Sequence, residues 1–355
     1  MAAVWCDDFK SYGTTPAFLL DGLYASASCL LVEDPDPIIT GTVLKLGTVA
    51  FFDNLRKVLP SAQATVGMCA RVWFEGLPGG AENPCFFRFN DGANTTHVSI
   101  AITSTGVIQA WRGTQSFPTG TLLGATTGPV VAANSFNHIE AKVKISDTVG
   151  TVEVRVNGVT VLNLTNQDTG NSADLTVAQV VLAPSGRGDL ATQVLPIYFK
   201  DFFVWDSTGA RNNNFAGTVN VVNLTPNSDV ALTWTLSGGA TGFSLVNESP
   251  PVDSTFISAA FPAPAADKMG QTNLPADVTS VKTLMTLVRA RKTDGGDGQL
   301  QVGLISGAST ALGANRPITT APTYYADIQE TDPATGVAWL PTAVDASNIQ
   351  FNRTL

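Results

Sequence analysis

The sequence predicts an all-β protein: an antiparallel jelly-roll β-sandwich followed by a second, smaller β-sandwich domain. Three observations lead to this fold class. Short runs rich in Val, Ile, Thr and aromatic residues alternate apolar and polar positions, and Gly, Pro, Asn and Asp separate them. The composition has 32 Gly, 20 Pro and only 14% charged residues, which is typical of strands joined by many turns. The length of 355 residues is enough for two substantial cores.

The first predicted domain spans residues 1–206. Its clearest element is a meander over 137–164, in which apolar and polar residues alternate and the Asn157-Gly158 pair supplies a tight turn. One polar and one apolar face suit the outer sheet of a sandwich. Residues 51–59 are open between strand and helix, because four of their apolar side chains would share a helical face. The other strands expected in this domain are 5–9, 64–74, 86–90, 97–102, 107–111, 178–182 and 198–205.

The second predicted domain spans residues 207–355. Its expected strands are 219–224, 231–236, 255–260, 281–290, 299–305 and 324–330. At 281–292 the alternation of apolar and polar residues favours a strand, although Lys, Leu and Met also form helices well. Turn-forming sequences at 294–298 and 332–336 separate the later strands.

The junction between the two domains is the most informative stretch. The strand at 199–206 has two largely apolar faces, so we expect both faces to be covered. The interdomain junction residues are Trp205, Asp206, Asn212, Asn213 and Phe215. Two large aromatic anchors and side chains that can cap the backbone distinguish this stretch from a Gly/Ser linker. We therefore expect 206–214 to be a short ordered bridge that fixes the relative orientation of the domains.

The same junction carries the motif D-x-T-G-x-x-N-N-x-F-x-G. Its residues are Asp206, Thr208, Gly209, Asn212, Asn213, Phe215 and Gly217. This motif resembles the junction in virion structural proteins of tailed bacteriophages, where it follows a jelly roll of the laminin-G/concanavalin-like kind. Further matching positions are Trp234, 246–248, Pro250, Pro251, Asp253, 290–294 and 330–333. The resemblance therefore covers nearly the whole chain.

The resemblance implies a structural component of a bacteriophage virion, in a tail, a fibre or spike, or a head decoration. It implies a location in the virion after assembly in the host bacterial cytoplasm, with other virion proteins as partners. Homo-oligomerisation, with a trimer favoured, would cover sheet edges and apolar patches. The alternative function is a host-surface polysaccharide-binding, or receptor-binding, module of a tail or head fibre.

Three residues are the carbohydrate-binding candidates under that alternative: Trp111, Arg112 and Phe117. Trp111 stands at a predicted strand end, and Phe117 follows in the next loop. Aromatic faces at such loop edges can stack on sugar rings, and jelly rolls of the family that the chain resembles often bind glycans there. An interior packing role explains the same aromatic residues, so both interpretations stay open.

The residues predict no catalysis, so we expect that the chain is not an enzyme. His97 and His138 lie in separate alternating strands, a position more typical of packing than of a catalytic base. Asp7 and Asp8 are adjacent in a predicted strand and would face opposite ways, so they cannot form a glycosidase pair. The sequence has no nucleophile elbow, zinc-protease motif or phosphate-binding loop.

No cofactor or metal is expected either. A loop calcium ion is the alternative, with oxygen ligands from Asp34, Asp36, Asn90, Asp91 and Asn94, but ordinary turn chemistry explains these residues and is favoured. The four cysteines, Cys6, Cys29, Cys69 and Cys85, fit no zinc-binding spacing. Buried free thiols are favoured for them, and disulfides formed after cell lysis are the alternative.

The charge and hydropathy pattern bear on partners. The net charge of −9 argues against a nucleic-acid partner. The densest basic group is Arg289, Arg291 and Lys292, and strand alternation divides it between two faces. No apolar run approaches the roughly 20 residues that a membrane helix needs, so we expect no membrane insertion. The N-terminal residues lack a signal-peptide pattern, which favours the cytoplasm as the place of synthesis.

Overall fold

The computed structural model describes most of the 355-residue chain. The described residues are 2–36, 41–47, 53–79, 83–114, 120–185, 195–239, 241–260 and 266–354. Two compact units are present. Unit 1 comprises Met1–Leu20 and Tyr24–Val221, and unit 2 comprises Asp21–Leu23 and Val222–Leu355. Residues 207–221 thus group with unit 1 by contact, whereas the sequence assigned them to the second domain.

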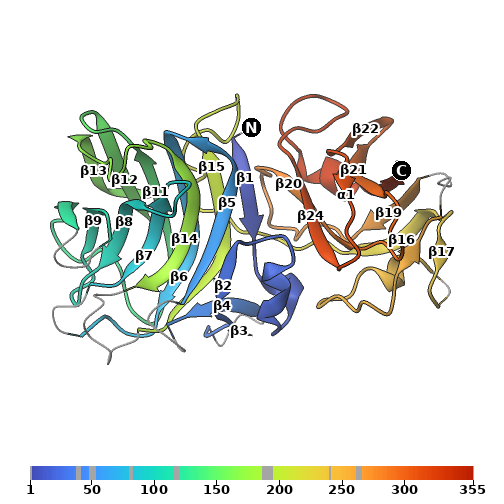
Figure 1. The fold of residues 1–355 in the computed structure, drawn as a ribbon, viewed down its shortest axis with the longest axis horizontal. Helices are drawn as coiled ribbons and strands as arrows, with labels where there is room; N and C mark the ends of the chain where they lie inside the picture. The colour runs from blue at the N-terminus through green and yellow to red at the C-terminus, as the bar shows by residue number, and fades with distance from the viewer. Residues whose placement is uncertain are drawn as a thin grey trace. The chain divides into compact units, whose positions relative to one another are not determined.

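Unit 1 contains two antiparallel sheets (Figure 1). The first sheet has the strand order β13-β12-β11-β6-β15-β4-β3, and β1 pairs with β15 beside it. Its strands are β1 (Ala3–Asp7), β3 (Leu30–Glu33), β4 (Thr42–Leu46), β6 (Thr65–Phe74), β11 (Phe136–Lys144), β12 (Gly150–Val156), β13 (Val159–Gln167) and β15 (Ile197–Asp206). The predicted meander is therefore the consecutive run β11-β12-β13.

The second sheet of unit 1 has the order β10-β9-β8-β7-β14-β5-β2. Its strands are β2 (Ser26–Ser28), β5 (Asn54–Gln63), β7 (Cys85–Asn90), β8 (Thr96–Ile102), β9 (Ile108–Arg112), β10 (Thr121–Ala125) and β14 (Val177–Ser185). Two short 3-10 helices, η1 (Lys10–Tyr12) and η2 (Pro16–Leu20), follow β1. The open choice at 51–59 is resolved for the described part, since residues 54–59 are strand in β5 and pair with β2 and β14.

The core of unit 1 lies between these two sheets. Phe87 of β7 and Phe199 of β15 approach with ring centroids 6.5 Å apart, and the centroids of Phe74 and Phe86 are 5.5 Å apart. All four rings are fully buried. Side chains from both sheets thus meet in one apolar layer, as a sandwich requires. The register shift between Cys85 and Phe87 lies where the consecutive residues Phe86 and Phe87 both contact the first sheet.

Unit 2 is also antiparallel β. Its largest sheet has the order β16-β19-β25-β21-β22, with β23 paired to β21. The strands are β16 (Pro226–Ala231), β19 (Asp267–Gln271), β21 (Gln299–Ser306), β22 (Ser309–Leu312), β23 (Arg316–Pro317) and β25 (Asn348–Arg353). Two smaller ladders are β17 (Thr235–Leu236) with β18 (Ile257–Ser258) and β20 (Leu284–Ala290) with β24 (Thr323–Gln329). Short helical turns are η3 (Phe243–Leu245) and α1 (Pro341–Asp345).

Unit 2 has two small core clusters among its described residues. The first contains Met269, Leu300, Val302 and Phe351, and the second contains Leu304, Trp339 and Val344. The predicted fold class, an all-β chain with a jelly-roll sandwich and a smaller second β-domain, is confirmed. In the described residues, the few helical elements are far too short to cross a membrane.

Two predicted strands are wrong. The expected strand at 231–236 is interrupted, since β16 ends at Ala231 and β17 spans only Thr235–Leu236. Residues 219–224 alternate like a strand but pair with none. The amide of Val219 instead donates to Nε2 of His138 at 3.5 Å, and the amide of Val221 donates to Oδ1 of Asp201 at 2.8 Å. Side chains of the first sheet thus supply the acceptors that a neighbouring strand would otherwise provide.

Candidate functional site: an arginine–tryptophan row on the second sheet

The second sheet carries one continuous row of residues across its strands. Strand register places Arg56 of β5 opposite Val181 of β14, and Val181 opposite Arg88 of β7. Arg88 lies opposite Ser99 of β8, which lies opposite Trp111 of β9. We call these five residues the Arg56–Trp111 row. Ser26 of β2 extends it at one end, and Leu122 of β10 extends it at the other.

This row faces away from the sandwich core. The neighbouring register row consists of Leu55, Leu182, Phe87, Ile100 and Ala110, all of which are buried. Phe87 in that row contacts Phe199 of the first sheet, so the buried row points inward. Successive strand residues point to opposite faces, and the Arg56–Trp111 row therefore occupies the outer face. Arg56, Arg88 and Trp111 are half-buried there, whereas Val181 and Ser99 are buried.

Among the described residues, Arg56 and Arg88 have no acidic partner on this face. Both side chains are half-buried, and their Nε atoms are buried without a hydrogen-bond partner. Within the described part of the chain, neither arginine has an ion pair. Two strand spacings separate their backbones, a distance of roughly 10 Å. Two cations thus stand on one face with Val181 between them.

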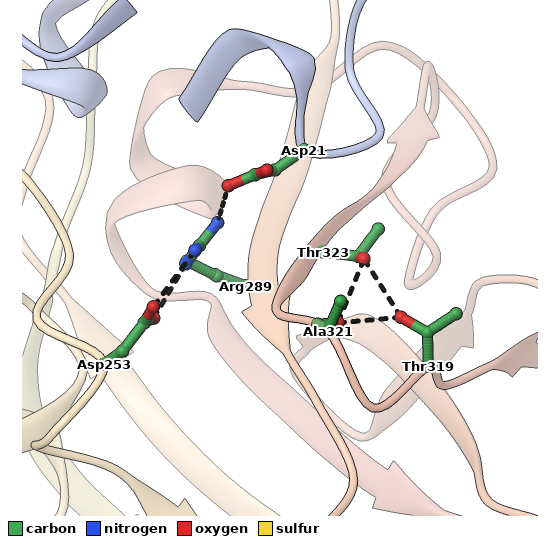
Figure 2. Close-up of polar contacts among 6 residues, drawn as sticks. All are labelled: Asp21, Asp253, Arg289, Thr319, Ala321 and Thr323. Carbon is green, nitrogen blue, oxygen red and sulfur yellow. Dashed lines mark hydrogen bonds and ion pairs between the residues drawn. The ribbon is translucent and has the colours of Figure 1, made fainter. Parts of the chain in front are cut away.

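Arg289 in unit 2, by contrast, has a guanidinium group that is paired with two carboxylates. Its Nε and Nη2 donate to the two carboxylate oxygens of Asp253 at 2.8 and 3.1 Å, and its Nη1 donates to Oδ2 of Asp21 at 2.5 Å (Figure 2). In the nearby turn, Thr319 and Thr323 both donate to the carbonyl oxygen of Ala321. Both sides of the Arg289 guanidinium group are therefore paired within unit 2, although Asp21 and Asp253 remain partly exposed.

Trp111 stands at the other end of the row. Its indole Nε1 donates to Oε1 of Gln109 at 3.2 Å, and the same oxygen accepts from Nδ2 of Asn83 at 3.0 Å. Trp111 is half-buried, and its row neighbour Leu122 is 46% exposed. The polar edge of the indole is therefore held by Gln109, which fixes the ring while leaving part of it at the surface.

The structure separates the three carbohydrate-binding candidates. Arg112 follows Trp111 in β9 and so lies on the opposite face, where its Nη1 forms an ion pair with Asp168. Phe117 lies outside the described residues. Sequence reasoning missed Arg56 and Arg88. Each was visible only as a single arginine within an apolar strand, and nothing in the sequence indicates that Val181 lies between them.

The junction residues lie against the outer face of the first sheet. Trp205 is buried, and its ring centroid is 6.0 Å from that of Phe215. The guanidinium carbon of Arg155 lies 3.7 Å from the Phe215 ring centroid.

Hydrogen bonds within the turn follow Trp205. Oδ1 of Asp206 accepts from the amide of Thr208 at 2.8 Å, and Nδ2 of Asn213 donates to the carbonyl oxygen of Gly209 at 3.0 Å. Asn212 adopts a left-handed backbone with φ 47°.

The remainder of this segment covers polar side chains of β11. The amide of Gly217 donates to Oε1 of Glu140 at 3.0 Å, and Glu140 is fully buried. His138 is also buried beneath the segment, and burial, with a further contribution from Arg71, lowers its pKa to about 4. The covered histidine therefore stays neutral near pH 7. It has a structural position here, as the sequence predicted for a lone strand histidine.

A buried polar cluster surrounds Asp7 near the N-terminus. Oδ2 of Asp7 accepts from the hydroxyls of Tyr12 and Tyr24 at 2.8 and 2.7 Å. Nζ of Lys57 lies 3.2 Å from the ring centroid of Trp5 in the same cluster. Burial raises the pKa of Asp7 to about 6 and lowers the pKa of Lys57 to about 7. The groups partner one another inside the unit, so this cluster offers no accessible site.

Asp34, Asn90, Asp91 and Asn94 of the calcium candidates form hydrogen bonds with other side chains. Oδ2 of Asp34 accepts from Nζ of Lys200 at 2.7 Å, Oδ2 of Asp91 accepts from the Ser172 hydroxyl at 2.7 Å, and Nδ2 of Asn90 donates to Oδ1 of Asn94 at 2.9 Å. Across the described ranges, no three His, Cys, Asp or Glu side chains are placed to hold a metal ion. The expectation of no cofactor stays a prediction.

All four cysteines are free, and Cys6, Cys69 and Cys85 are buried.

Comparisons with known proteins give structural similarity alone. No family model and no curated protein matches the chain. Similar solved structures include the alginate lyase Aly36B, at 16% identity over 56% of this chain and 95% of that one with a TM-score of 0.39. Another is the alginate lyase vAL-1 from Chlorella virus, at 14% identity over 57% and 99% with a TM-score of 0.41. The carbohydrate-binding module CBM66 from Bacillus subtilis matches at 6% identity over 52% and 96% with a TM-score of 0.32.

One sequence expectation is corrected by these comparisons. The chain was expected not to be an enzyme, but the similar structures include alginate lyases and a sialidase, the latter at 15% identity over 57% of this chain and 18% of that chain with a TM-score of 0.37. Similarity at this level does not assign an activity, so the function has to be argued from the residues of this chain.

Proposed function

We propose that unit 1 is a polysaccharide-binding module whose binding surface is the Arg56–Trp111 row. The observation that carries this proposal is the register that aligns Arg56, Arg88 and Trp111 on one outer sheet face. A sugar ring can stack on the half-buried indole of Trp111, which Gln109 holds in place. The two guanidinium groups supply donors for sugar oxygens along the same line.

The two outer faces of the unit 1 sandwich differ in a way that supports this assignment. Residues 207–221 lie on the first sheet, and their backbone amides donate hydrogen bonds to polar side chains of this sheet, including Glu140 and Asp201. On the second sheet, the arginines of the row keep unsatisfied donors. The outer face of the second sheet thus combines two cationic side chains with a half-buried aromatic ring, a combination suited to a ligand.

The test is affinity electrophoresis of the full chain through gels that contain single polysaccharides. We expect retardation by at least one polysaccharide, and we expect Trp111→Ala to abolish it. Trp73→Ala is the matched control, because Trp73 is also a half-buried strand tryptophan but belongs to β6 of the first sheet. Thermal melting checks that both variants fold. Retardation that survives Trp111→Ala, or that Trp73→Ala removes equally, would overturn the assignment of this face.

A role in a bacteriophage virion is a second proposal, supported by the junction motif from Asp206 to Gly217. The receptor-binding alternative combines both proposals, since a tail or head fibre could carry a polysaccharide-binding module. Virion partners and a trimeric assembly are part of this second proposal. Detection of the chain in purified particles, together with a trimer mass by light scattering, would support it. A monomer that is absent from particles would contradict it.

A further inference from the structure

We infer that the polysaccharide bound by the row is acidic, with carboxylate groups that pair with Arg56 and Arg88. This inference rests on the proposed function and names the chemical class of its ligand. Its basis is the pairing state of the arginines. Five other arginines of the described chain have an acidic partner: Arg71, Arg112, Arg155, Arg289 and Arg316.

Among the described arginines in the strands of unit 1, Arg56 and Arg88 are the two without an acidic partner. The chain has 29 acidic residues against 20 basic ones, so acidic side chains are plentiful. The row nevertheless contains none, because its other members are Val181, Ser99 and Trp111. Partly desolvated cations without a counter-ion are unfavourable, and two on one face repel each other. A ligand that brings negative charge removes both costs.

Carboxylates match this arrangement in geometry as well as in charge. The guanidinium group is planar and forms paired hydrogen bonds with carboxylate oxygens. Arg56 and Arg88 lie in line with Trp111, so a linear polymer crossing the strands would meet these three half-buried side chains, with the buried residues Val181 and Ser99 between them. An acidic polymer with spaced charges and stackable rings fits best.

The experiment measures binding of the full chain to polygalacturonate and hyaluronan by calorimetry. Each polymer is paired with its methyl-esterified form, which keeps the backbone and removes the charge. Dextran sulfate tests whether any polyanion suffices. We expect at least one carboxylated polymer to bind, its ester to bind at least about tenfold more weakly, and Arg56→Gln or Arg88→Gln to cost about tenfold each. Lys144→Gln is the control, because Lys144 is an exposed cation on β11 of the first sheet.

The outcomes separate this inference from the proposed function. If an ester binds as tightly as its acid and Trp111→Ala abolishes binding, the module binds polysaccharide but the acidic class is wrong. Dextran sulfate binding equal to that of the carboxylated polymer would also overturn the carboxylate assignment, as would equal losses in Lys144→Gln and Arg88→Gln. If no polymer of any charge binds, including neutral dextran, the proposed function itself fails.

Discussion

Arg56 and Arg88 pair in register with opposite sides of the same residue, Val181, and so share one outer face two strands apart. The two arginines are separated by 31 intervening residues in the sequence. Neither has an acidic neighbour in its row, whereas Arg289 has two aspartates. Arg289 is therefore paired within the protein, whereas the proposed ligand would pair Arg56 and Arg88. This contrast leads to a prediction about the stability of the ligand-free protein.

Removing either unpaired cation should stabilise the free protein. Arg56→Met and Arg88→Met keep the apolar stem of the side chain and remove the charge and the buried Nε. We expect each variant to raise the free energy of unfolding by roughly 1 kcal/mol, because binding residues are often unfavourable in the absence of ligand. Urea denaturation measures the change. Arg112→Met is the reference, since it breaks the ion pair with Asp168 and should not stabilise. A loss of stability in both row variants would contradict the argument.

Packing of the junction against the first sheet predicts a sensitive glycine. A Cβ at Gly67 of β6 would overlap the indole ring of Trp205. We expect Gly67→Ala to lower the free energy of unfolding by roughly 2 kcal/mol or more, because the buried ring has no room to move. Gly128→Ala is the matched control, since a Cβ there meets no atom within 4 Å. Equal denaturation midpoints for the two variants would show that the Trp205 contact is unimportant.

The ordered-bridge prediction can be tested by limited proteolysis. Phe215 packs beside Trp205 and under the Arg155 guanidinium, so these contacts should protect residues 206–214 from cleavage. We expect the wild-type chain to resist cutting within this stretch, and we expect Phe215→Ala to be cut there several times faster. Mass spectrometry locates the cleavage sites. Rapid cutting of the wild-type chain between Asp206 and Asn214 would mean that the bridge is flexible.

Buried His138 predicts a specific loss of stability in acid. Its folded pKa of about 4 lies below the unfolded value of about 6.5, so the unfolded chain binds the proton first as pH falls. The stability linked to a neutral His138 is therefore complete above pH 6.5 and is lost as pH falls toward 4, by about 3 kcal/mol. His138→Gln cannot be protonated and should lack this loss. Parallel stability profiles for wild type and His138→Gln between pH 7 and 4 would contradict the prediction.

The sequence predicted the parts of the fold that depend on local pattern. The alternation at 137–164 and the Asn157-Gly158 turn became β11, β12 and β13 because neighbouring strands of a meander are joined by short turns. The sequence likewise marked Trp205 and Phe215 as aromatic anchors at the ends of a short polar stretch, and the structure shows that the two rings also contact each other. In both cases the interacting residues are close in sequence.

The predictions that failed, or could not be made, depend on contacts far apart in the chain. Residues 219–224 have a strand-like pattern, but two of their amides donate to side chains of β11 and β15, and these residues pair with no strand. The row that joins Arg56 to Trp111 depends on β14 lying between β5 and β7, an order that no local pattern encodes. Arg112 was chosen because it adjoins Trp111, yet adjacent strand residues face opposite ways.

The most direct test of the binding surface is a crystal structure of the full chain with tetragalacturonate. The account predicts sugar density over the outer face of the second sheet, with a ring stacked on Trp111 and carboxylates within hydrogen-bond distance of Arg88 and Arg56. Oligosaccharide bound only to the first sheet, only to unit 2, or only at a site remote from the row would contradict it.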